Sequence, residues 1–182
     1  LWSDHGQHLG EKKHWRKQAL WEESTKVPLF ISVPGQRTSG MTSSRAVSLL
    51  DIYPTLLDLC KLPESSKLEG QSLVPLIKDP QKEWNRPVLC TWRYKNHAVR
   101  SEEWRYIRYR DGSEELYNLK NDPGEHNNLA DDPAYTGIIK ELKKWLPEKD
   151  ALPAGKTEWT GDRLDRRIEE WIKADSIPYW LK

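Results

Sequence analysis

Long apolar runs are missing from this 182-residue sequence, and none approaches the roughly 20 residues that a membrane-spanning helix needs. The first residues also lack the basic and then apolar pattern of a secretory signal. Hydrophobic residues make up 36% of the chain, and its mean hydropathy is -0.86. We therefore expect no membrane span, and a core no larger than that of one ordinary domain or two small ones.

An excess of charge of either sign is also missing. Lys and Arg number 29 against 28 Asp and Glu, which gives a formal net charge of +1. The two signs are mixed along the chain, and no basic stripe stands out that would neutralise phosphate groups. We therefore expect no nucleic-acid partner.

Cysteine is scarce as well. Cys60 and Cys90 are too few for a disulfide framework, and their spacing is not that of a metal-binding pair. Phe and Met occur once each, whereas Trp occurs ten times. So many indoles either fill the core or line a cleft for sugars, and both interpretations stay open.

The pattern of apolar residues predicts regular elements in the first part of the chain. Residues 15–25 are expected to form a short helix, and residues 27–33, rich in β-branched and aromatic side chains, a buried strand. Residues 46–60 predict a short strand and then a helix capped by Asp51.

The second part predicts a small antiparallel sheet covered by a helix. Strand-like runs occur at residues 86–92, 96–102, 103–110 and 114–119. Asp111 and Gly112 favour a hairpin between the last two. A helix beginning at Asp132-Pro133 has apolar residues at helical spacing from Tyr135 to Leu146, so one of its faces is suited to cover the sheet.

Changes in composition divide the chain into four parts. Residues 1–60 are expected to be the end of a larger α/β domain, 61–86 a connection, 87–146 a small α+β subdomain and 147–182 a helical tail. Within the tail, Leu164 to Ile172 have the spacing of an amphipathic helix.

Three of the five histidines fall within the first 14 residues. Leu1-Trp2 have the character of a strand end, and Asp4 and His5 follow on a loop that Gly6 leaves free to turn. Ligands bind beyond the carboxyl ends of strands in open α/β sheets, and both carboxylate and imidazole bind divalent cations. Asp4 and His5 are therefore a candidate metal pair; in the alternative, Asp4 caps the turn and His5 is an ordinary surface residue.

Several basic side chains follow the metal pair. Positive groups beside a cation can hold a substrate oxyanion. Most of these residues are expected to lie on a solvated helix face, namely Lys12, Lys13, His14 and Arg16. Lys17 is the one that we expect to turn back towards the loop, with Trp15 packed beneath it.

The stretch "SDHGQHLGEKKHWRK", followed by "VPLFISVPG", resembles the C-terminal half of the sulfatase family, within the alkaline-phosphatase-like superfamily. The resemblance is greatest to the iduronate-2-sulfatase-like bacterial sulfatases. It continues through "VSLLDIYPTLLDLCKLP" and "ELYNLKNDPGEHNNLA" and covers about residues 1–130. It implies an α/β fold, the C-terminal part of an alkaline-phosphatase-like sulfatase, which ends in a small antiparallel sheet packed by a helix.

The resemblance also implies roles for individual residues. The residues that match Asp4 and His5 complete a Ca²⁺ site in such sulfatases, and the residue that matches Lys17 contacts the sulfate. Because calcium prefers oxygen ligands, the imidazole of His5 keeps Zn²⁺ and Mn²⁺ open as alternatives. It also keeps open a second function, that of a metal-dependent phosphodiesterase or phosphomutase of the same superfamily.

The attacking group of a sulfatase is missing from this sequence. Sulfatases use a formylglycine made from the Cys or Ser of a C/S-x-P-x-R motif, and the nearest match, from Ser32 to Gln36, has Gln in place of Arg. We therefore expect the formylglycine upstream, in an N-terminal part of the same enzyme, and expect this chain alone to be inactive. A non-catalytic interaction unit is the third hypothesis.

The resemblance further implies that loops of the smaller domain form one wall of the substrate pocket. His97, Arg100 and Arg105 are candidates to bind a sugar carboxylate, and Trp92 or Trp104 to stack on the ring. In the alternative, these basic residues pair with nearby acidic residues. A sulfated glycosaminoglycan or related polysaccharide is the expected substrate, and an extracytoplasmic location the expected compartment.

Overall fold

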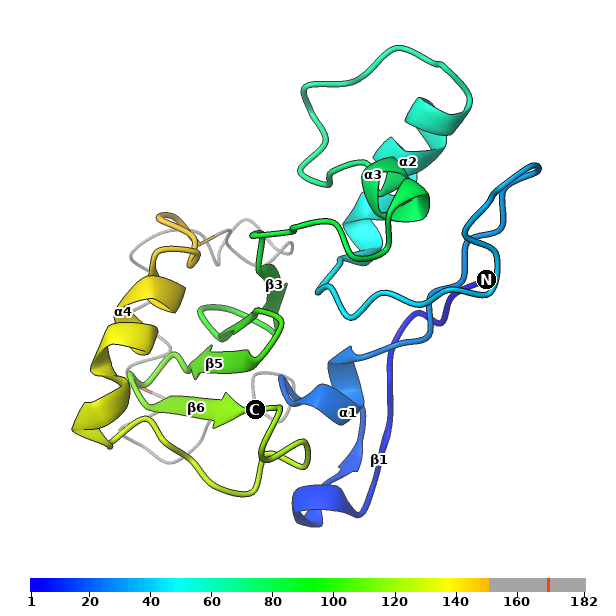
Figure 1. Ribbon diagram of the computed structural model, residues 1–182. Helices are drawn as coiled ribbons and strands as arrows, with labels where there is room; N and C mark the ends of the chain where they lie inside the picture. Colours follow the sequence, from blue (N-terminus) through cyan, green and yellow to red (C-terminus); the bar gives the residue numbers. More distant parts are fainter. Residues whose placement is uncertain (151–169, 171–182) are drawn as a thin grey trace.

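A four-stranded antiparallel sheet forms the centre of the chain in the computed structural model, which describes residues 1–150 and Glu170. The strands lie in sequence order: β3 (Val88–Thr91), β4 (His97–Arg100), β5 (Trp104–Arg108) and β6 (Glu114–Asn118). Figure 1 shows α4 (Thr136–Lys143) on one side of the sheet and α1 (Glu22–Thr25) on the other. The predicted small antiparallel sheet is confirmed.

Alternation along the central strands gives the sheet two apolar faces. On one face, Val99, Tyr106 and Leu116 are fully buried and pack against Ile139 and Leu142 of α4. This is the predicted cover of the sheet by a helix. Successive side chains of a strand point to opposite faces of the sheet, so the residues that alternate with these form the other face.

The opposite face is covered by the N-terminal part of the chain. Ala98, Ile107 and Tyr117 pack there against Leu20, which is only 2% exposed. Residues far apart in sequence thus share one core, and the segment before α1 is fixed directly on the sheet.

Local capping explains where the sheet turns and where α4 begins. Gly112 has a φ of +88° in the predicted hairpin, and Oδ1 of Asp111 accepts a hydrogen bond from the Ser113 amide at 2.9 Å. A 3-10 turn, η3 (Pro133–Tyr135), precedes α4, and the Asp132 side chain accepts a hydrogen bond from the Ala134 amide at 2.9 Å. The predicted start of this helix is confirmed.

The helix predicted within residues 46–60 is also confirmed, as α2 (Ile52–Leu59) after the 3-10 turn η2 (Leu49–Asp51). Its cap differs from the prediction, because Ser48 and Asp51 form a reciprocal capping box. The buried Asp51 carboxylate also accepts a hydrogen bond from the Gln71 amide and pairs with Arg86 at 2.7 Å. The Asp51 carboxylate therefore connects the N-terminal end of α2 to the segment that follows this helix.

The connection predicted over residues 61–86 contains a helix that the sequence did not indicate, α3 (Val74–Lys78). Val74 and Leu76 of this helix are buried. Five residues give too few turns for a helical period to stand out in the sequence. The predicted divisions of the chain near residues 60, 86 and 146 stay predictions.

The helix predicted over residues 15–25 is wrong for most of its length. The segment up to Thr25 instead contains β1 (His8–Leu9), the 3-10 turn η1 (Glu11–Lys13), β2 (Trp15–Arg16), paired with β1, and the short α1. The Leu20 carbonyl accepts a hydrogen bond from the buried Arg105 at 2.7 Å. The Leu20 carbonyl, which would accept a backbone hydrogen bond in a longer helix, thus binds Arg105. This tertiary contact overrides the local helix propensity.

The buried strand predicted at residues 27–33 is wrong in its burial. The segment is extended, but its pairing is one antiparallel bridge between Trp2 and Leu29, supported by a 2.8 Å hydrogen bond from the Phe30 amide to Leu1. The Phe30 side chain is 63% exposed. A β-rich sequence forms a buried strand only where neighbours cover it, and the described residues cover little of this one.

The amphipathic helix predicted near Leu164 to Ile172 lies outside the described residues. Within the described part of the chain, no helix is long and apolar enough to cross a membrane.

Candidate metal and anion site

The loop that carries Asp4 and His5 is fixed against α1. The Gly6 amide donates a hydrogen bond to the Ser24 carbonyl at 3.0 Å, and the Ser3 hydroxyl donates to the His5 carbonyl at 3.0 Å. A Cβ atom on Gly6 would lie 1.9 Å from the carbonyl oxygen of Glu23, far inside contact distance. The Asp4-His5-Gly6 sequence therefore needs glycine because two backbones meet there.

The structure brings Asp4, His5 and Lys17 together, as the sequence predicts. Lys17 follows strand β2 and does not lie on the predicted helix, and Trp15, expected beneath it, is 67% exposed. Nε2 of His5 lies 3.4 Å from Oδ2 of Asp4 and 2.6 Å from Nζ of Lys17. The Asp4 side chain is 82% exposed and that of His5 is 36% exposed. A carboxylate, an imidazole and an ammonium group thus lie close together on an accessible surface.

The hydrogen bonds of His5 assign its tautomer. Nδ1 lies 2.8 Å from the Gly6 carbonyl oxygen, which accepts only, so Nδ1 carries the proton. Nε2 then holds the lone pair, and the Lys17 ammonium donates to it. This is the tautomer in which Nε2 is able to bind a metal ion, with Nδ1 held by a backbone carbonyl.

The donor set on this loop is incomplete by itself. Among residues 1–150 and Glu170, no group of three or more His, Cys, Asp or Glu side chains is arranged to hold a metal ion. Asp4 and His5 supply one oxygen and one nitrogen, and the other ligands of a full coordination shell need another source.

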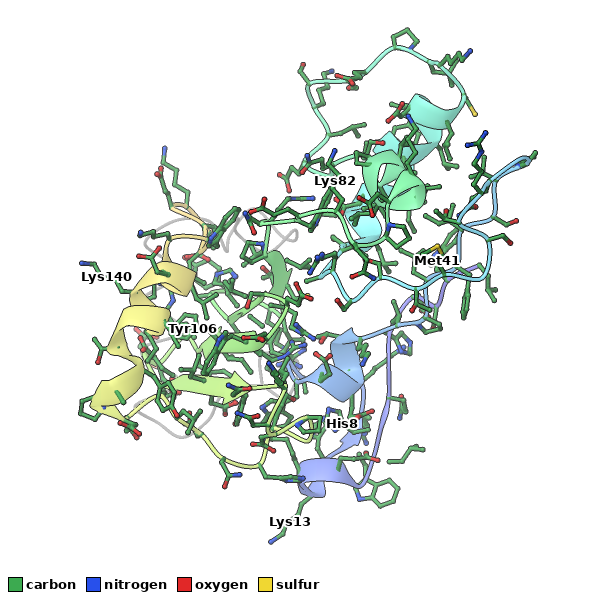
Figure 2. All side chains as sticks on the ribbon, in the orientation of Figure 1. His8, Lys13, Met41, Lys82, Tyr106 and Lys140 are labelled. Atoms are coloured by element: carbon green, nitrogen blue, oxygen red, sulfur yellow. The ribbon has the colours of Figure 1, made fainter. Side chains whose placement is uncertain are left out.

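The other basic residues of the N-terminal stretch divide into two groups. Lys13 and Arg16 are exposed as predicted, but on a 3-10 turn and a strand and not on a helix, and Figure 2 shows Lys13 directed away from the molecule. Lys12 departs from the prediction, because its ammonium donates to the Tyr117 hydroxyl at 3.1 Å and lies 4.8 Å from the centre of the Trp21 ring. Lys12 thus connects the N-terminal segment to strand β6 of the sheet.

Two histidines face inward, although His14 was expected on a solvated helix face. His8 is 1% exposed, its ring centre lies 5.1 Å from that of His14, and both rings contact Trp21 at 5.8 Å. Neither ring nitrogen of His8 has a hydrogen-bond partner within the described part of the chain. Burial lowers the pKa of His8, and the neighbouring His14 lowers it further. A polar residue on an irregular two-residue strand gives no sequence signal of burial.

Arg100 and Arg105 meet an acidic partner that the sequence did not suggest. Arg100 contacts the Glu22 carboxylate at 3.1 Å, and Arg105 binds the same carboxylate while its Nε lies 2.8 Å from Glu125. Burial alone would raise the pKa of Glu22, but hydrogen bonds and charges from the two arginines outweigh it and lower that pKa. Burial raises the pKa of Glu125, against the charge of Arg105. This network binds α1 to the sheet.

The other predicted substrate residue, His97, lies inside the protein. It is 2% exposed, with Nδ1 2.9 Å from the Thr91 hydroxyl and Nε2 2.5 Å from the Asp150 carboxylate. Contact with a sugar would require His97 to leave these partners. Arg100 would likewise have to leave Glu22, so the sugar-binding role of both residues stays a prediction.

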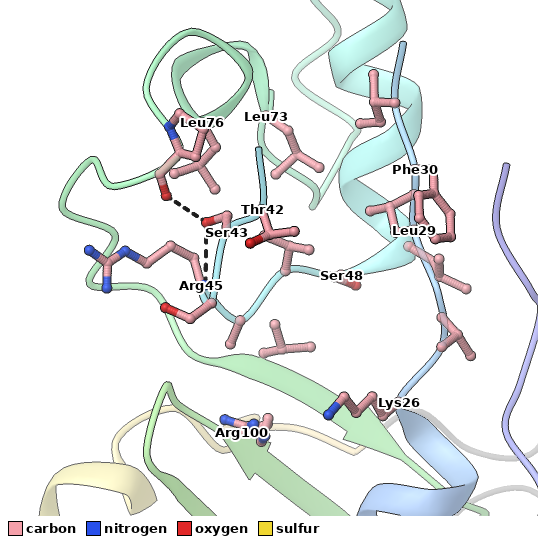
Figure 3. A pocket seen from close by; sticks show the side chains of 18 of the residues that line it. Lys26, Leu29, Phe30, Thr42, Ser43, Arg45, Ser48, Leu73, Leu76 and Arg100 are labelled. Carbon is pink, nitrogen blue, oxygen red and sulfur yellow. Dashed lines mark hydrogen bonds between the residues drawn. The ribbon is translucent and has the colours of Figure 1, made fainter. Parts of the chain in front are cut away.

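A cavity of about 1420 Å³ opens beside the loop that carries Asp4, and Asp4, Lys26 and Arg100 contribute to its lining. Figure 3 shows the apolar part of its wall, where Leu29 and Phe30 face the loop that leads to α2. Small-molecule sites usually occupy about 300–1,000 Å³, so this space is larger than a single sugar needs.

Comparison with known families gives one clear match. The family described as "N-sulphoglucosamine sulphohydrolase, C-terminal" matches residues 10–151. The matched segment includes Lys17, the acidic and basic network around Glu22, and the whole four-stranded sheet.

Individual proteins agree with this match. A sulfatase of Formosa agariphila is 39% identical over 160 residues, which cover 88% of this chain and 31% of that protein. The solved structure of a protein in complex with its substrate D-glucosamine-2-N,6-O-disulfate has a TM-score of 0.70 and 27% identity, covering 79% of this chain and 32% of that one. A phosphonate monoester hydrolase of Agrobacterium radiobacter has a TM-score of 0.67 and 27% identity over the same shares. The chain thus spans about a third of the length of the proteins that it matches.

Proposed function

Because the chain belongs to the N-sulphoglucosamine sulphohydrolase C-terminal family of the sulfatases, we propose that it is part of an enzyme that hydrolyses sulfate esters. In this proposal it contributes two ligands of a divalent cation and a lysine that contacts the sulfate. The observation that carries the proposal is the convergence of Asp4 and Lys17 on Nε2 of His5.

Asp4 and His5 would hold the cation. The Asp4 carboxylate is exposed, and the tautomer of His5 leaves the Nε2 lone pair available once Lys17 moves away. The resemblance to sulfatases favours Ca²⁺, whereas the imidazole suits Zn²⁺ or Mn²⁺ better. When bound, such a cation acts as a Lewis acid on a sulfate oxygen.

Lys17 would hold the sulfate. Its ammonium has a single partner, Nε2 of His5, among the interactions described above, and its side chain is exposed. A sulfate oxygen carries negative charge and is a stronger acceptor for an ammonium than a neutral imidazole nitrogen. Lys17 therefore exchanges His5 for the sulfate and stabilises the charge that develops on oxygen during hydrolysis.

The nucleophile would come from outside these 182 residues, because the C/S-x-P-x-R motif is missing from the sequence. We expect an N-terminal part of the same enzyme to supply it, to complete the metal site and to cover the large cavity. The apolar side chains of the cavity lining that await such a cover include Leu1, Phe30 and Met41, each at least 59% exposed. The 182-residue chain alone is then inactive.

The substrate class in this proposal is a sulfated sugar of the glycosaminoglycan type. The structural relative that was solved with a disulfated glucosamine supports it, and Arg100 is the candidate for a sugar carboxylate if it exchanges Glu22 for substrate. The likeness to a phosphonate monoester hydrolase keeps a phosphonate or phosphate ester as the second candidate. An extracytoplasmic location is part of the same proposal.

A chimeric enzyme tests the function. This chain replaces the matching C-terminal part of the Formosa agariphila sulfatase, to which it is 39% identical. The chimera should hydrolyse an aryl sulfate faster than an aryl phosphonate, and the Lys17→Met substitution should lower kcat/KM by about 100-fold.

The matched control is Lys140→Met, which removes an exposed lysine of α4 far along the chain from Lys17 and should leave kcat/KM unchanged. A folded chimera that prefers the phosphonate supports the second candidate. Equal activity of Lys17→Met and Lys140→Met would refute the role of Lys17.

A further inference from the structure

Strand β2 brings Lys17 to His5, but the strand itself is exposed. Its two residues, Trp15 and Arg16, both face solvent, and it pairs with β1, which is equally short. A two-stranded pair of this size has little stability in water unless other contacts hold it. The position of Lys17 therefore depends on how the rest of the β1–β2 hairpin is held.

The backbone of the hairpin is strained in the residues that lead to Lys17. Lys12, Lys13 and Arg16 have φ values of 52°, 57° and 119°, which residues with a Cβ atom disfavour. Such conformations persist where surrounding contacts hold them, and they are frequent at functional sites. Because these residues directly precede Lys17 in the chain, a contact that holds the tip of the hairpin also helps to decide where Lys17 lies.

Lys12 connects the tip of the hairpin to the sheet. Its ammonium donates to the Tyr117 hydroxyl at 3.1 Å and to the Glu125 carbonyl oxygen. The same ammonium lies 4.5 Å from the centre of the Tyr117 ring and 4.8 Å from that of the Trp21 ring. These are charge-assisted hydrogen bonds and cation–π contacts on a half-buried side chain, where both are stronger than at an exposed lysine.

The groups that bind Lys12 are themselves fixed. Tyr117 lies on β6 and is 3% exposed, and its hydroxyl donates to the Glu115 carboxylate at 2.9 Å. Nε1 of Trp21 donates to the same carboxylate at 2.7 Å. The side chain of Glu125 is buried as well. Lys12 therefore connects the tip of the hairpin to a rigid part of the molecule.

We propose that Lys12 is a positioning residue for Lys17. By holding the tip of the hairpin against Tyr117 and Glu125, it fixes β2 so that the Lys17 ammonium reaches Nε2 of His5. Lys12 acts through the hairpin, from the end opposite to His5, and needs no contact with a metal ion or a sulfate. Its importance for catalysis rests on the proposed function of Lys17, whereas its effect on the position of Lys17 does not.

NMR of the ¹⁵N-labelled 182-residue chain tests the positioning without any catalysis. Loss of the hydrogen bond from Lys17 changes the ¹⁵N shift of Nε2 in His5, and Lys17→Met gives the size of that change. Lys12→Met should move the His5 signal most of the way to its position in Lys17→Met. Lys13→Met is the matched control, because this neighbouring lysine is exposed and directed away from the molecule (Figure 2), and it should leave the signal at the parent position.

The chimeric enzyme described above tests whether Lys12 acts through Lys17. Lys12→Met should lower kcat/KM by about tenfold, mainly through kcat, because a displaced Lys17 stabilises the transition state less. In the Lys17→Met background, the same substitution should lower kcat/KM by less than about twofold, since the group that it positions is gone. Lys12→Arg keeps the charge and the donors and should retain more activity than Lys12→Met.

The outcomes separate this inference from the proposed function. A His5 signal at the parent position in Lys12→Met, or equal losses from Lys12→Met with and without the Lys17 ammonium, would overturn the positioning role. If Lys17→Met leaves kcat/KM unchanged, the catalytic role of Lys17 fails, and the His5 signal still decides whether Lys12 positions it.

A second variant keeps the test decisive if Lys12→Met does not fold. Tyr117→Phe removes the hydroxyl that accepts from Lys12 and keeps the ring beneath the ammonium. It should move the His5 signal in the same direction as Lys17→Met, by a smaller amount. An unmoved signal in a folded Tyr117→Phe variant would then overturn the role of Lys12.

Discussion

The Lys17 ammonium donates a hydrogen bond to Nε2 of His5 over 2.6 Å, although 12 positions separate the two residues. The bond exists because β2 pairs with β1 and returns the chain from Arg16 towards the loop after Trp2. A positive group thus already lies beside the imidazole lone pair and the Asp4 carboxylate. In the proposed function, a divalent cation takes this place when the site is complete.

Gly6→Ala should destabilise the protein by more than about 2 kcal/mol, because the new Cβ would lie 1.9 Å from the Glu23 carbonyl oxygen. The loop that carries Asp4 and His5 would have to leave α1. Gly137→Ala in α4 is the control, because nothing lies within 4 Å of its Cβ position, and it should be neutral or stabilise by up to about 1 kcal/mol. Urea denaturation measures both, and equal effects would contradict the close approach at Gly6.

Glu22→Gln should cost about 3 kcal/mol, because it breaks a buried pair and leaves Arg105, which is 2% exposed, with less compensation. Glu103→Gln, at an exposed pair with Lys120, should cost less than about 1 kcal/mol. The same denaturation experiment compares the two variants. A loss as small as that of Glu103→Gln would mean that the network does not hold α1 on the sheet.

The lowered pKa of Glu22 also predicts that the protein loses stability in acid. Its folded-state pKa is lowered from 4.5, so its contribution is present above the unfolded pKa and is lost as the pH falls through the folded pKa. The slope of the unfolding free energy below pH 4.5 should therefore be smaller in Glu22→Gln than in the parent protein. Identical slopes would show that Glu22 has the same pKa in the folded and unfolded states.

The lowered pKa of His8 predicts a separate loss of stability nearer to neutral pH. Burial lowers its folded-state pKa from 6.5, so the unfolded state binds the proton first, and stability declines as the pH falls below 6.5 through the folded pKa. The residues that face His8 are His14 and Trp21, with the acidic side chains of Glu11 and Glu23 acting on it from a longer range.

His8→Leu should flatten this part of the profile, because leucine keeps the apolar contact with Trp21 and has no group to protonate. His126→Gln is the control, since His126 is exposed and is not among the groups that act on His8. Thermal unfolding midpoints between pH 7.5 and 5 follow the effect. A His8→Leu profile as steep as that of the parent would assign the pH dependence to another group.

The sheet and its helix were predictable because their signals are local and repeated. Alternation in β5 places Tyr106 on one face and Ile107 on the other, and Asp132-Pro133 marks the start of the last described helix. The family resemblance predicted the grouping of Asp4, His5 and Lys17, and the structure brings them together. Their roles on a metal and a sulfate stay proposals.

The errors arose where long-range contacts decide the conformation. The residues after Trp15 have helix propensity, but Leu20 contacts the sheet and Arg105 instead of continuing a helix. No local sequence pattern indicates these contacts. The partner of Arg100 turned out to be Glu22, 78 positions away, and not the neighbouring acidic residues. Pairings at such separations depend on the topology and leave no periodic signal in the sequence.

The most direct test of the central claim is a titration of the ¹⁵N-labelled chain with Mn²⁺, whose paramagnetism broadens signals near even a weakly bound ion. The signals of Asp4 and His5 should broaden first, the Lys17 ammonium should leave Nε2 of His5, and Asp4→Asn should abolish the effect. Broadening that begins at other carboxylates, such as Asp131 and Asp132, while Asp4 and His5 stay sharp would contradict the assignment of a cation site to this loop.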